Sequence, residues 1–407
     1  MNKIFKIIWS KARNCYVVVS EIAHCQGKGQ GQKKAVLTCS LAAALTIFTL
    51  TGGVTAVQAE TGTNAYAAGV DANATGENAT AVGHSASATG KNATAVGNGA
   101  KALAEDAMAI GNGANVGEKG NASLAIGTGA QASGGNDIVI GHDAKNESNQ
   151  SDGLIVIGHG ATVKNNGTPK DSIAIGTSAN VVGKNNIAIG TSAAVTNNSG
   201  NNAISLGTEA KAEKSESIAI GMKAHANNND GIAAIAIGSG AEAQKDKSIA
   251  IGYKTLAENN GESGGIAIGS SIVDSQGNII TQTKAAQGND IAFGVGAQTN
   301  NRNMNGHNGG SIAIGHLSYS NGNQDVAIGD NAKTGRIGTE GEGYVAIGAN
   351  SFSNVGPGVR GYDPHTQKSH EFQDKEARAV WESTNGAVSV VMSVVIVERG
   401  LLAKSLG

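Results

Sequence analysis

The chain has few of the residues from which a thick globular core is built. Of its 407 residues only 13 are aromatic and 3 are proline. So few rings leave few anchors for a deep core, and the scarcity of proline, without a Gly-X-Y period, excludes collagen. Only 15% of the residues are charged, which argues against disorder driven by charge. With 60 glycines, these absences favour a thin, regular, repetitive structure.

Cysteine is absent from most of the chain, because Cys15, Cys25 and Cys39 all lie within the first 59 residues. Neither disulfides nor cysteine metal sites can therefore hold the remainder together. The first 59 residues also contain seven basic residues and one acidic residue, so residues 60–407 carry 23 basic and 31 acidic residues and a formal charge of −8. This acidic balance argues against nucleic acid as a partner.

Residues 1–59 have the features of an export signal. An uncharged apolar run over 35–57 follows Lys33 and Lys34, and a small-x-small tripeptide ends at Ala59. We therefore predict cleavage after Ala59. The alternative is a transmembrane anchor, for which about 20 apolar residues would suffice. Gly52, Gly53 and several hydroxyl residues dilute the run, which favours the cleaved signal.

A five-residue phrase such as Ser172-Ile173-Ala174-Ile175-Gly176 recurs through the middle of the chain. The phrase ends at glycines 83, 97, 111, 127, 141, 158, 176, 190, 207, 221, 238, 252, 269, 294, 315, 329 and 348. Seven of the sixteen spacings equal 14 and several equal 17, which indicates a 14-residue repeat with insertions. Asparagine-rich stretches at 197–200 and 227–229 fall in the lengthened gaps and are predicted to be loops.

Each repeat is predicted to form two short strands separated by turns. Ile173 and Ile175 are two residues apart and so share one face of a strand, while Ala174 lies on the other. Recurring β-branched residues and glycine exclude a helix. We expect stacked isoleucine pairs to form the structural core and the alanine face to pack against another chain. The isoleucines of this predicted core are Ile173, Ile175, Ile218, Ile220, Ile249, Ile251, Ile312 and Ile314.

Two regions resemble parts of one protein family. Asn2-Lys3-Ile4, Ile8-Trp9 and Val19-Ser20-Glu21 resemble the extended signal peptide of Gram-negative autotransporters. The repeats of residues 60–355 resemble the head of the YadA-like trimeric autotransporter adhesins. This resemblance implies Sec-dependent export and an all-β fold, a left-handed parallel β-roll of ~14-residue repeats in which three chains form one head.

The end of the chain departs from that family. Residues 356–390, with Tyr362, Asp363, Pro364 and Trp381, resemble a head-to-neck junction, and residues 391–407 form an aberrant tail. When the codons of the tail are read in a shifted frame, they can encode the Gly-Asn-Val and Thr-Arg-Gln-Ile-Thr-Gly segments of the family. We therefore expect a frameshift near Val390. The neck, the stalk and the membrane anchor of intact homologues would then be missing. Intact members lie on the cell surface, whereas this product is expected to be periplasmic or released.

Candidate chemical groups are scattered. His142 and His159 follow phrase-ending glycines on consecutive repeats, at a position that elsewhere holds varied residues, so an exposed turn is favoured over a metal site. Residues 134–137 resemble half of a calcium-binding nonapeptide but occur once, and such motifs work when repeated. No recurring pair of carboxylates is present. We therefore expect no catalytic, metal or cofactor site.

The favoured function is a non-catalytic bacterial adhesin that attaches to host cells, extracellular matrix or other bacteria as a homotrimer. A secreted carbohydrate-active β-solenoid enzyme would need a carboxylate pair and aromatic subsites, and residues 60–407 hold nine aromatics. An ice-binding solenoid would need aligned threonines, which follow the glycine irregularly, at 128, 177, 191 and 208. Family members that bind collagen carry asparagine directly before the serine of the repeated five-residue phrase. Here that residue is Asp171, Glu216, Lys247 or Gly310.

Overall fold

The computed structural model describes residues 5–10, 15–20, 62–148, 151–164, 170–196, 201–226, 232–258, 264–300, 309–335, 343–354, 362–363, 368–369 and 388–390. The chain divides into two compact units, Met1–Val54 and Thr55–Gly407. In the first unit β1 (Phe5–Ser10) pairs antiparallel with β2 (Cys15–Ser20). The apolar run at 35–57, the predicted cleavage site at Ala59 and the predicted loops at 197–200 and 227–229 lie outside the described residues.

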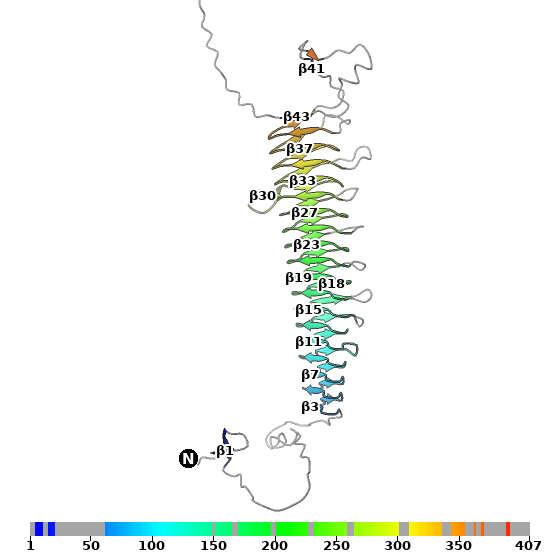
Figure 1. Cartoon of the computed structure of the whole chain (residues 1–407), viewed down its shortest axis with the longest axis vertical. Helices are drawn as coiled ribbons and strands as arrows, with labels where there is room; N and C mark the ends of the chain where they lie inside the picture. The colour runs from blue at the N-terminus through cyan, green and yellow to red at the C-terminus, as the bar shows by residue number, and fades with distance from the viewer. Residues whose placement is uncertain are drawn as a thin grey trace, which may run out of the picture. The chain divides into compact units, whose positions relative to one another are not determined.

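The second unit is a solenoid in which each coil adds one strand to each of two parallel sheets (Figure 1). The first sheet consists of β3 (Tyr66–Ala68), β5 (Thr80–Val82), β7 (Thr94–Val96), β9 (Met108–Ile110), β11 (Leu124–Ile126), β13 (Ile138–Ile140), β15 (Ile155–Ile157), β17 (Ile173–Ile175), β19 (Ile187–Ile189), β21 (Ile204–Leu206), β23 (Ile218–Ile220), β25 (Ile235–Ile237), β27 (Ile249–Ile251), β29 (Ile266–Ile268), β33 (Ile291–Phe293), β35 (Ile312–Ile314), β37 (Val326–Ile328), β39 (Val345–Ile347) and β43 (Val388–Val390).

The second sheet is built from shorter strands. It consists of β4 (Asn73–Ala74), β6 (Ser87–Ala88), β8 (Lys101–Ala102), β10 (Asn115–Val116), β12 (Gln131–Ala132), β14 (Lys145–Asn146), β16 (Thr162–Lys164), β18 (Asn180–Val182), β20 (Ala194–Val195), β22 (Lys211–Ala212), β24 (His225–Ala226), β26 (Glu242–Ala243), β28 (Leu256–Ala257), β32 (Lys284–Ala285), β34 (Gln298–Thr299), β36 (Tyr319–Ser320), β38 (Lys333–Thr334) and β40 (Phe352–Ser353).

The register places equivalent residues of successive repeats directly over one another. Ile173 pairs with Ile155 in the preceding coil and with Ile187 in the following one. The prediction of an all-β parallel solenoid is confirmed, with repeats that average about 16 residues. The repeats also begin one coil earlier than the phrase indicates, because Gly69 ends β3 with the same backbone conformation as the later phrase glycines.

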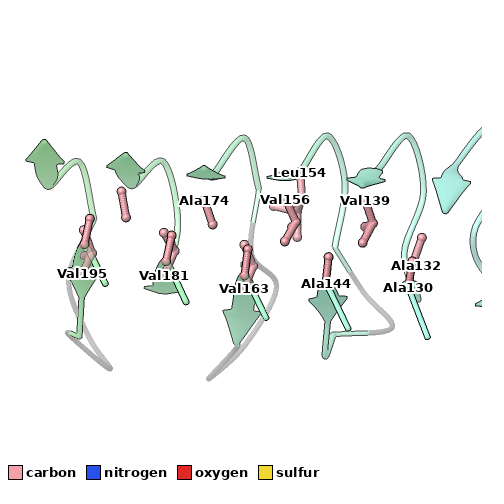
Figure 2. Close-up of a cluster of buried hydrophobic side chains, with 14 of the residues drawn as sticks. Ala130, Ala132, Val139, Ala144, Leu154, Val156, Val163, Ala174, Val181 and Val195 are labelled. Atoms are coloured by element: carbon pink, nitrogen blue, oxygen red, sulfur yellow. The ribbon is translucent and has the colours of Figure 1, made fainter. Parts of the chain in front are cut away.

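The two faces of each strand are the reverse of those predicted. Ala174 is fully buried inside the coil, whereas Ile173 and Ile175 lie half-buried on its outside. The same holds at every predicted core pair: Ile218, Ile220, Ile249, Ile251, Ile312 and Ile314 all point outward. Figure 2 shows alanine and valine side chains of both sheets pointing into the space between them. The prediction of an isoleucine interior is therefore wrong for the single chain.

The physical reason is the narrowness of the coil. Four inward positions per coil meet between two strands of two or three residues, for example Ser172, Ala174, Ala179 and Val181, and all four are buried. Protein interiors are close-packed, so a gap that alanine fills has no room for isoleucine. Most large apolar side chains therefore occupy the outer positions. Leu154 and Tyr344, directly before β15 and β39, are buried exceptions.

The phrase-ending glycines form a column that tolerates no side chain. Gly97 has φ of 134°, a conformation that residues with a Cβ rarely adopt. A Cβ at Gly97 would also lie 2.4 Å from the carbonyl oxygen of Gly111 in the next coil. Both constraints recur along the column, which explains why the phrase ends in glycine in each repeat.

Asparagine and aspartate recur at a turn position with left-handed backbone. Asn64, Asn78, Asn92 and Asp106 have φ between 56° and 58°, a region in which asparagine and aspartate are enriched. Their side chains also form a ladder along the solenoid: Asn64 donates to Asn78 at 3.1 Å, Asn78 to Asn92 at 3.0 Å, and Asn92 to Asp106 at 2.9 Å.

The predicted junction is described only in part. Tyr362 and Asp363 form β41, which pairs antiparallel with β42 (Lys368–Ser369). Pro364, Trp381 and the tail at 391–407 lie outside the described residues. Beyond β42 the chain returns to the solenoid, where β43 pairs in parallel with β39 and extends the first sheet.

Candidate functional surface

The outer positions of the first sheet form an almost unbroken apolar surface, which we call the aliphatic face. It holds two columns of side chains, one from each end of the three-residue strands. From β13 onward the first column consists of isoleucine, and then of valine in β37 and β39. These side chains remain partly open to solvent, and Leu206 is 41% exposed. A contiguous apolar surface of this extent marks an interaction site.

The outer positions of the second sheet form a surface of different character, which we call the polar face. Most of its side chains are charged or carry amides or hydroxyls. In chain order the side chains of the polar face, including its few apolar members, are Asn73, Ser87, Lys101, Asn115, Gln131, Lys145, Thr162, Asn180, Ala194, Lys211, His225, Glu242, Leu256, Lys284, Gln298, Tyr319, Lys333 and Phe352. Polar, exposed side chains on a rigid scaffold suit recognition of a soluble or cell-surface ligand.

Shallow hollows lie along the described part of the polar face, among them two of about 380 Å³ each. One is lined by Ser192, Glu209, Lys211, Lys223 and His225. The other is lined by side chains that include Gln298, Leu317, Tyr319 and Lys333. Both are open depressions along stacked side chains, which fits a broad binding surface better than an enclosed catalytic pocket.

His225 lies between two carboxylates on neighbouring coils of the polar face. Its Nε2 is 3.0 Å from Oε1 of Glu213, and its Nδ1 is 4.0 Å from Oε1 of Glu242. All three side chains are at least a quarter exposed. Exposed ion pairs of this kind contribute ~0–1 kcal/mol, so the group shapes the surface charge more than the stability.

The histidines considered for metal binding lie on the turns after the phrase glycines. The rings of His142 and His159 stack with centroids 5.1 Å apart, and Nδ1 of His142 is 3.3 Å from Oδ2 of Asp143. His142 and Asp143 are more than half exposed. Within the described ranges, no three histidine, cysteine, aspartate or glutamate residues are arranged to hold a metal ion.

Several polar residues inside the solenoid link one coil to the next, and we call the four that carry a carboxylate or an amide the cross-coil acceptors. They are Asp137, Asn186, Asp290 and Asp325, all at the inward position directly before a first-sheet strand. Each accepts a hydrogen bond from the backbone N–H at the same position of the next coil. The donors are Leu154 at 3.0 Å, Ala203 at 2.8 Å, Ser311 at 2.9 Å and Tyr344 at 2.9 Å.

In the part of the chain that the structure describes, each cross-coil acceptor bridges a spacing longer than 14 residues. Across spacings of 14, the hydroxyls of Ser123 and Ser172 accept the equivalent N–H groups, of Asp137 at 2.8 Å and of Asn186 at 3.2 Å. In other short repeats the equivalent N–H bonds to a carbonyl three residues earlier, as Ala93 does to Gly90 at 3.2 Å. A buried N–H without an acceptor would cost about 1–3 kcal/mol. Where the turn is altered, the cross-coil acceptor of the preceding coil accepts the hydrogen bond from this N–H. Asp137 therefore has a structural role rather than the calcium-ligand role that its motif suggests.

Burial raises the pKa of Asp137 and of Asp325 above the usual carboxyl range. Hydrogen bonds from Leu154, Ser151 and Asn146 oppose this effect at Asp137 without cancelling it. The opposite shift occurs at exposed Asp274, where the side chain and backbone of Asn278 lower the pKa of the carboxyl.

The sequence reasoning missed a hairpin that projects from one coil. Strands β30 (Ile272–Val273) and β31 (Ile279–Thr281) pair antiparallel and stand beside the column in Figure 1. They lie within the 25-residue spacing between Gly269 and Gly294. Two apolar pairs flanking a Gly-Asn turn are a hairpin signal that could have revealed it.

Two family models match the chain. Residues 1–50 match the extended signal peptide of type V secretion systems, which supports export through Sec. The YadA head domain repeat matches residues 61–86, 88–114, 119–144, 170–193, 199–224, 230–255 and 309–332. A search of curated proteins found no significant match.

Together the matched ranges cover more than half of the 407 residues, and they correspond to the two regions in which the sequence shows the resemblance. Neither match supports a carbohydrate-active enzyme or an ice-binding protein. Among the described residues, no helix is long and apolar enough to cross a membrane. With its extended signal peptide and its solenoid of head repeats, the chain belongs to the family of YadA-like trimeric autotransporter adhesins.

Proposed function

We propose that the solenoid is the non-catalytic head of a homotrimeric adhesin, in which three aliphatic faces pack together and three polar faces remain outside to bind a ligand. The observation that carries this proposal is the aliphatic face, which is nearly continuous from β13 to β39 and partly exposed in the single chain. Burying apolar surface contributes ~25 cal/mol per Å². Burial of a long aliphatic surface between chains therefore strongly favours their association.

A second copy of the same chain is the partner that fits this face best. The rungs repeat at roughly 4.8 Å, the spacing of neighbouring strands. A partner that covers the whole face must have rungs at the same spacing, and an identical chain has them. Rotation about an axis parallel to the solenoid places equal rungs at equal heights and closes the assembly. The trimeric state of the matched family selects three copies.

The first experiment tests assembly with residues 60–407, which contain the solenoid and no cysteine. We expect a trimer by analytical ultracentrifugation. Ile175→Lys places a charge on the aliphatic face and should give a folded monomer with retained β circular dichroism. Ala174→Lys is the matched control, because it buries the charge inside the coil and should prevent folding. A folded wild-type monomer would refute the trimer.

The second experiment tests adhesion. We expect the purified trimer to bind at least one component of a panel of matrix proteins, host cells and bacterial cells. Binding should weaken when charges on the polar face are reversed at Lys211 and Lys333, positions outside the aliphatic face. Reversal of turn residue Lys91 is the matched control. Hydrolysis of a panel polysaccharide by the purified trimer would contradict the non-catalytic role.

A further inference from the structure

The β30–β31 hairpin is an insertion into an otherwise regular coil. Residues 272–282 separate Ser271 from Thr283, and Thr283 occupies the buried position that Thr255 holds one coil earlier. Without these residues the spacing from Gly269 to Gly294 would fall from 25 to 14, the length of a short repeat. The solenoid therefore does not need the hairpin to close its coil.

The hairpin is held firmly at its base and at its tip. Ser271 donates to the carbonyl of Lys254 at 2.7 Å, and the Lys254 ammonium donates to the carbonyl of Gly277. At the tip, the Asp274 carboxylate accepts the backbone N–H of Gln276 at 2.9 Å and of Asn278 at 2.7 Å. A rigid projection loses little conformational entropy when it docks, which suits it to binding.

The apolar side chains of the hairpin are unusually exposed. Ile280 is 66% exposed and Ile279 is 46% exposed. On the next coil Phe293, which replaces isoleucine in the aliphatic face, is 51% exposed, and Val295 on the following turn is 43% exposed. A Cβ at Gly296 would lie 3.2 Å from Cδ1 of Ile272, so this turn adjoins the hairpin. The apolar surface thus continues from the aliphatic face onto the hairpin, which stands at the corner between the two faces. On its other side Thr281 lines a hollow with polar-face residues that include Tyr319, and Gln298 donates to the carbonyl of Gln282 at 2.9 Å.

We propose that the hairpin is an intersubunit clasp, in which Ile279 and Ile280 of one chain pack on the edge of the neighbouring chain at about the same height. This inference rests on the proposed trimer and adds a contact beyond the aliphatic faces. The second copy is the occupant that the structure favours, because the exposed residues continue the surface that the trimer buries. Rotational symmetry about an axis parallel to the solenoid brings each hairpin level with the corresponding coils of its neighbour.

The clasp can be tested by cross-linking, since residues 60–407 contain no cysteine. Ile280→Cys is labelled with benzophenone maleimide, sedimented to establish its oligomeric state, and irradiated. We expect covalent dimers and trimers on denaturing gels, with the linked peptide within a few coils of residue 280. Lys101→Cys, on the polar face and far from the hairpin, is the matched control and should give no interchain product.

The outcomes separate the clasp from the trimer. If the labelled protein sediments as a trimer but links only within its own chain, the clasp is overturned and the trimer stands. If wild type sediments as a monomer, both are overturned. If only the Ile280→Cys protein is monomeric, residue 280 supports assembly, which favours the clasp.

A deletion gives an independent measurement. Removing residues 272–282 leaves a connection of the same length as that of the preceding coil, so the variant should keep its β circular dichroism. We expect its subunits to exchange between trimers roughly tenfold faster or more, because the apolar contacts of the hairpin are lost. Met222→Ser, which removes an exposed apolar side chain from an ordinary turn, should leave exchange unchanged. Equal exchange rates for the deletion and wild type would overturn the clasp.

Discussion

The early and late coils of the solenoid share one fold but have different interiors. In the coils between residues 65 and 116 the inward side chains are all alanine, apart from Val116, and the phrase glycines are 14 residues apart. In the coils between residues 283 and 353 more than half of the inward side chains are polar, and all but one of the spacings are longer. The first-sheet register stays intact in both regions.

This difference shows how the interior of a coil changes when its repeat is lengthened by an insertion. Short repeats pair their backbone groups through regular turns and adjacent coils, so the interior needs only to be small and apolar. In several longer repeats the backbone N–H before the first-sheet strand bonds to a side chain of the preceding coil instead of to a carbonyl three residues earlier. A buried side chain such as Asp290 replaces that acceptor and is itself fixed by Thr299, whose Oγ1 donates to it at 2.7 Å. Buried carboxylate and amide acceptors therefore accompany several of the longer repeats.

The largest effect is expected at the glycine column, which both regions share. Gly97→Ala and Gly315→Ala should each destabilise the fold by about 3 kcal/mol or more, because each adds backbone strain and a collision with the next coil. Gly99→Ala is the control: its φ is 64° but its Cβ would meet nothing within 4 Å, so the expected loss is ~1 kcal/mol. Chemical denaturation measures all three. Equal losses at Gly97 and Gly99 would show that stacking between coils does not constrain the column.

The second-largest effect is expected where a polar interior residue is removed from the later coils, and it should have no counterpart in the early coils. Asp290→Ala leaves the buried N–H of Ser311 without its acceptor and should cost about 1–3 kcal/mol. The loss should appear as faster amide hydrogen exchange at Ser311 and in β35. Glu105→Ala, an exposed acid among the short repeats, should change stability by less than ~0.5 kcal/mol. Unchanged exchange at Ser311 would show that the Asp290 carboxylate does not protect this N–H.

A smaller, pH-dependent effect follows from the raised pKa values of Asp137 and Asp325. The folded state holds the proton more tightly than the unfolded state, so the stabilisation is complete below the ordinary carboxyl pKa and is lost as the pH rises through the raised pKa. Acidification from neutral pH should therefore protect β37 and β39 against amide exchange, after correction for the intrinsic rate. Asp325→Asn should reduce this dependence. An identical pH response in the variant would exclude Asp325 as its source.

The smallest effect is expected for ion pairs among the short repeats. Nζ of Lys91 lies 3.5 Å from Oε2 of Glu77, and both side chains are about half exposed. Lys91→Met should change the free energy of unfolding by no more than ~0.5 kcal/mol, with the difference vanishing in high salt. A loss above ~1 kcal/mol would show that surface charge contributes more to the regular coils than their alanine interior suggests.

Much of this protein could be predicted from local pattern. The two-residue alternation, the glycine at each phrase end and the 14-residue spacing indicate stacked strands, because strand periodicity and left-handed turns are properties of neighbouring residues. The leader motifs and the repeat phrase likewise identified the family. The absence of cysteine beyond residue 59 already showed that backbone pairing and packing must hold the solenoid together.

The tertiary structure decided which face is inside, which side chains bridge coils and where the hairpin stands. Alternation separates Ile173 from Ala174 but says nothing about which of them faces inward; the narrow gap between the two sheets settles this in favour of alanine. Asp290 and Ser311 are 21 residues apart, so their contact depends on how the intervening chain closes its coil. Such contacts depend on the three-dimensional path of the chain, which the repeat pattern alone does not contain.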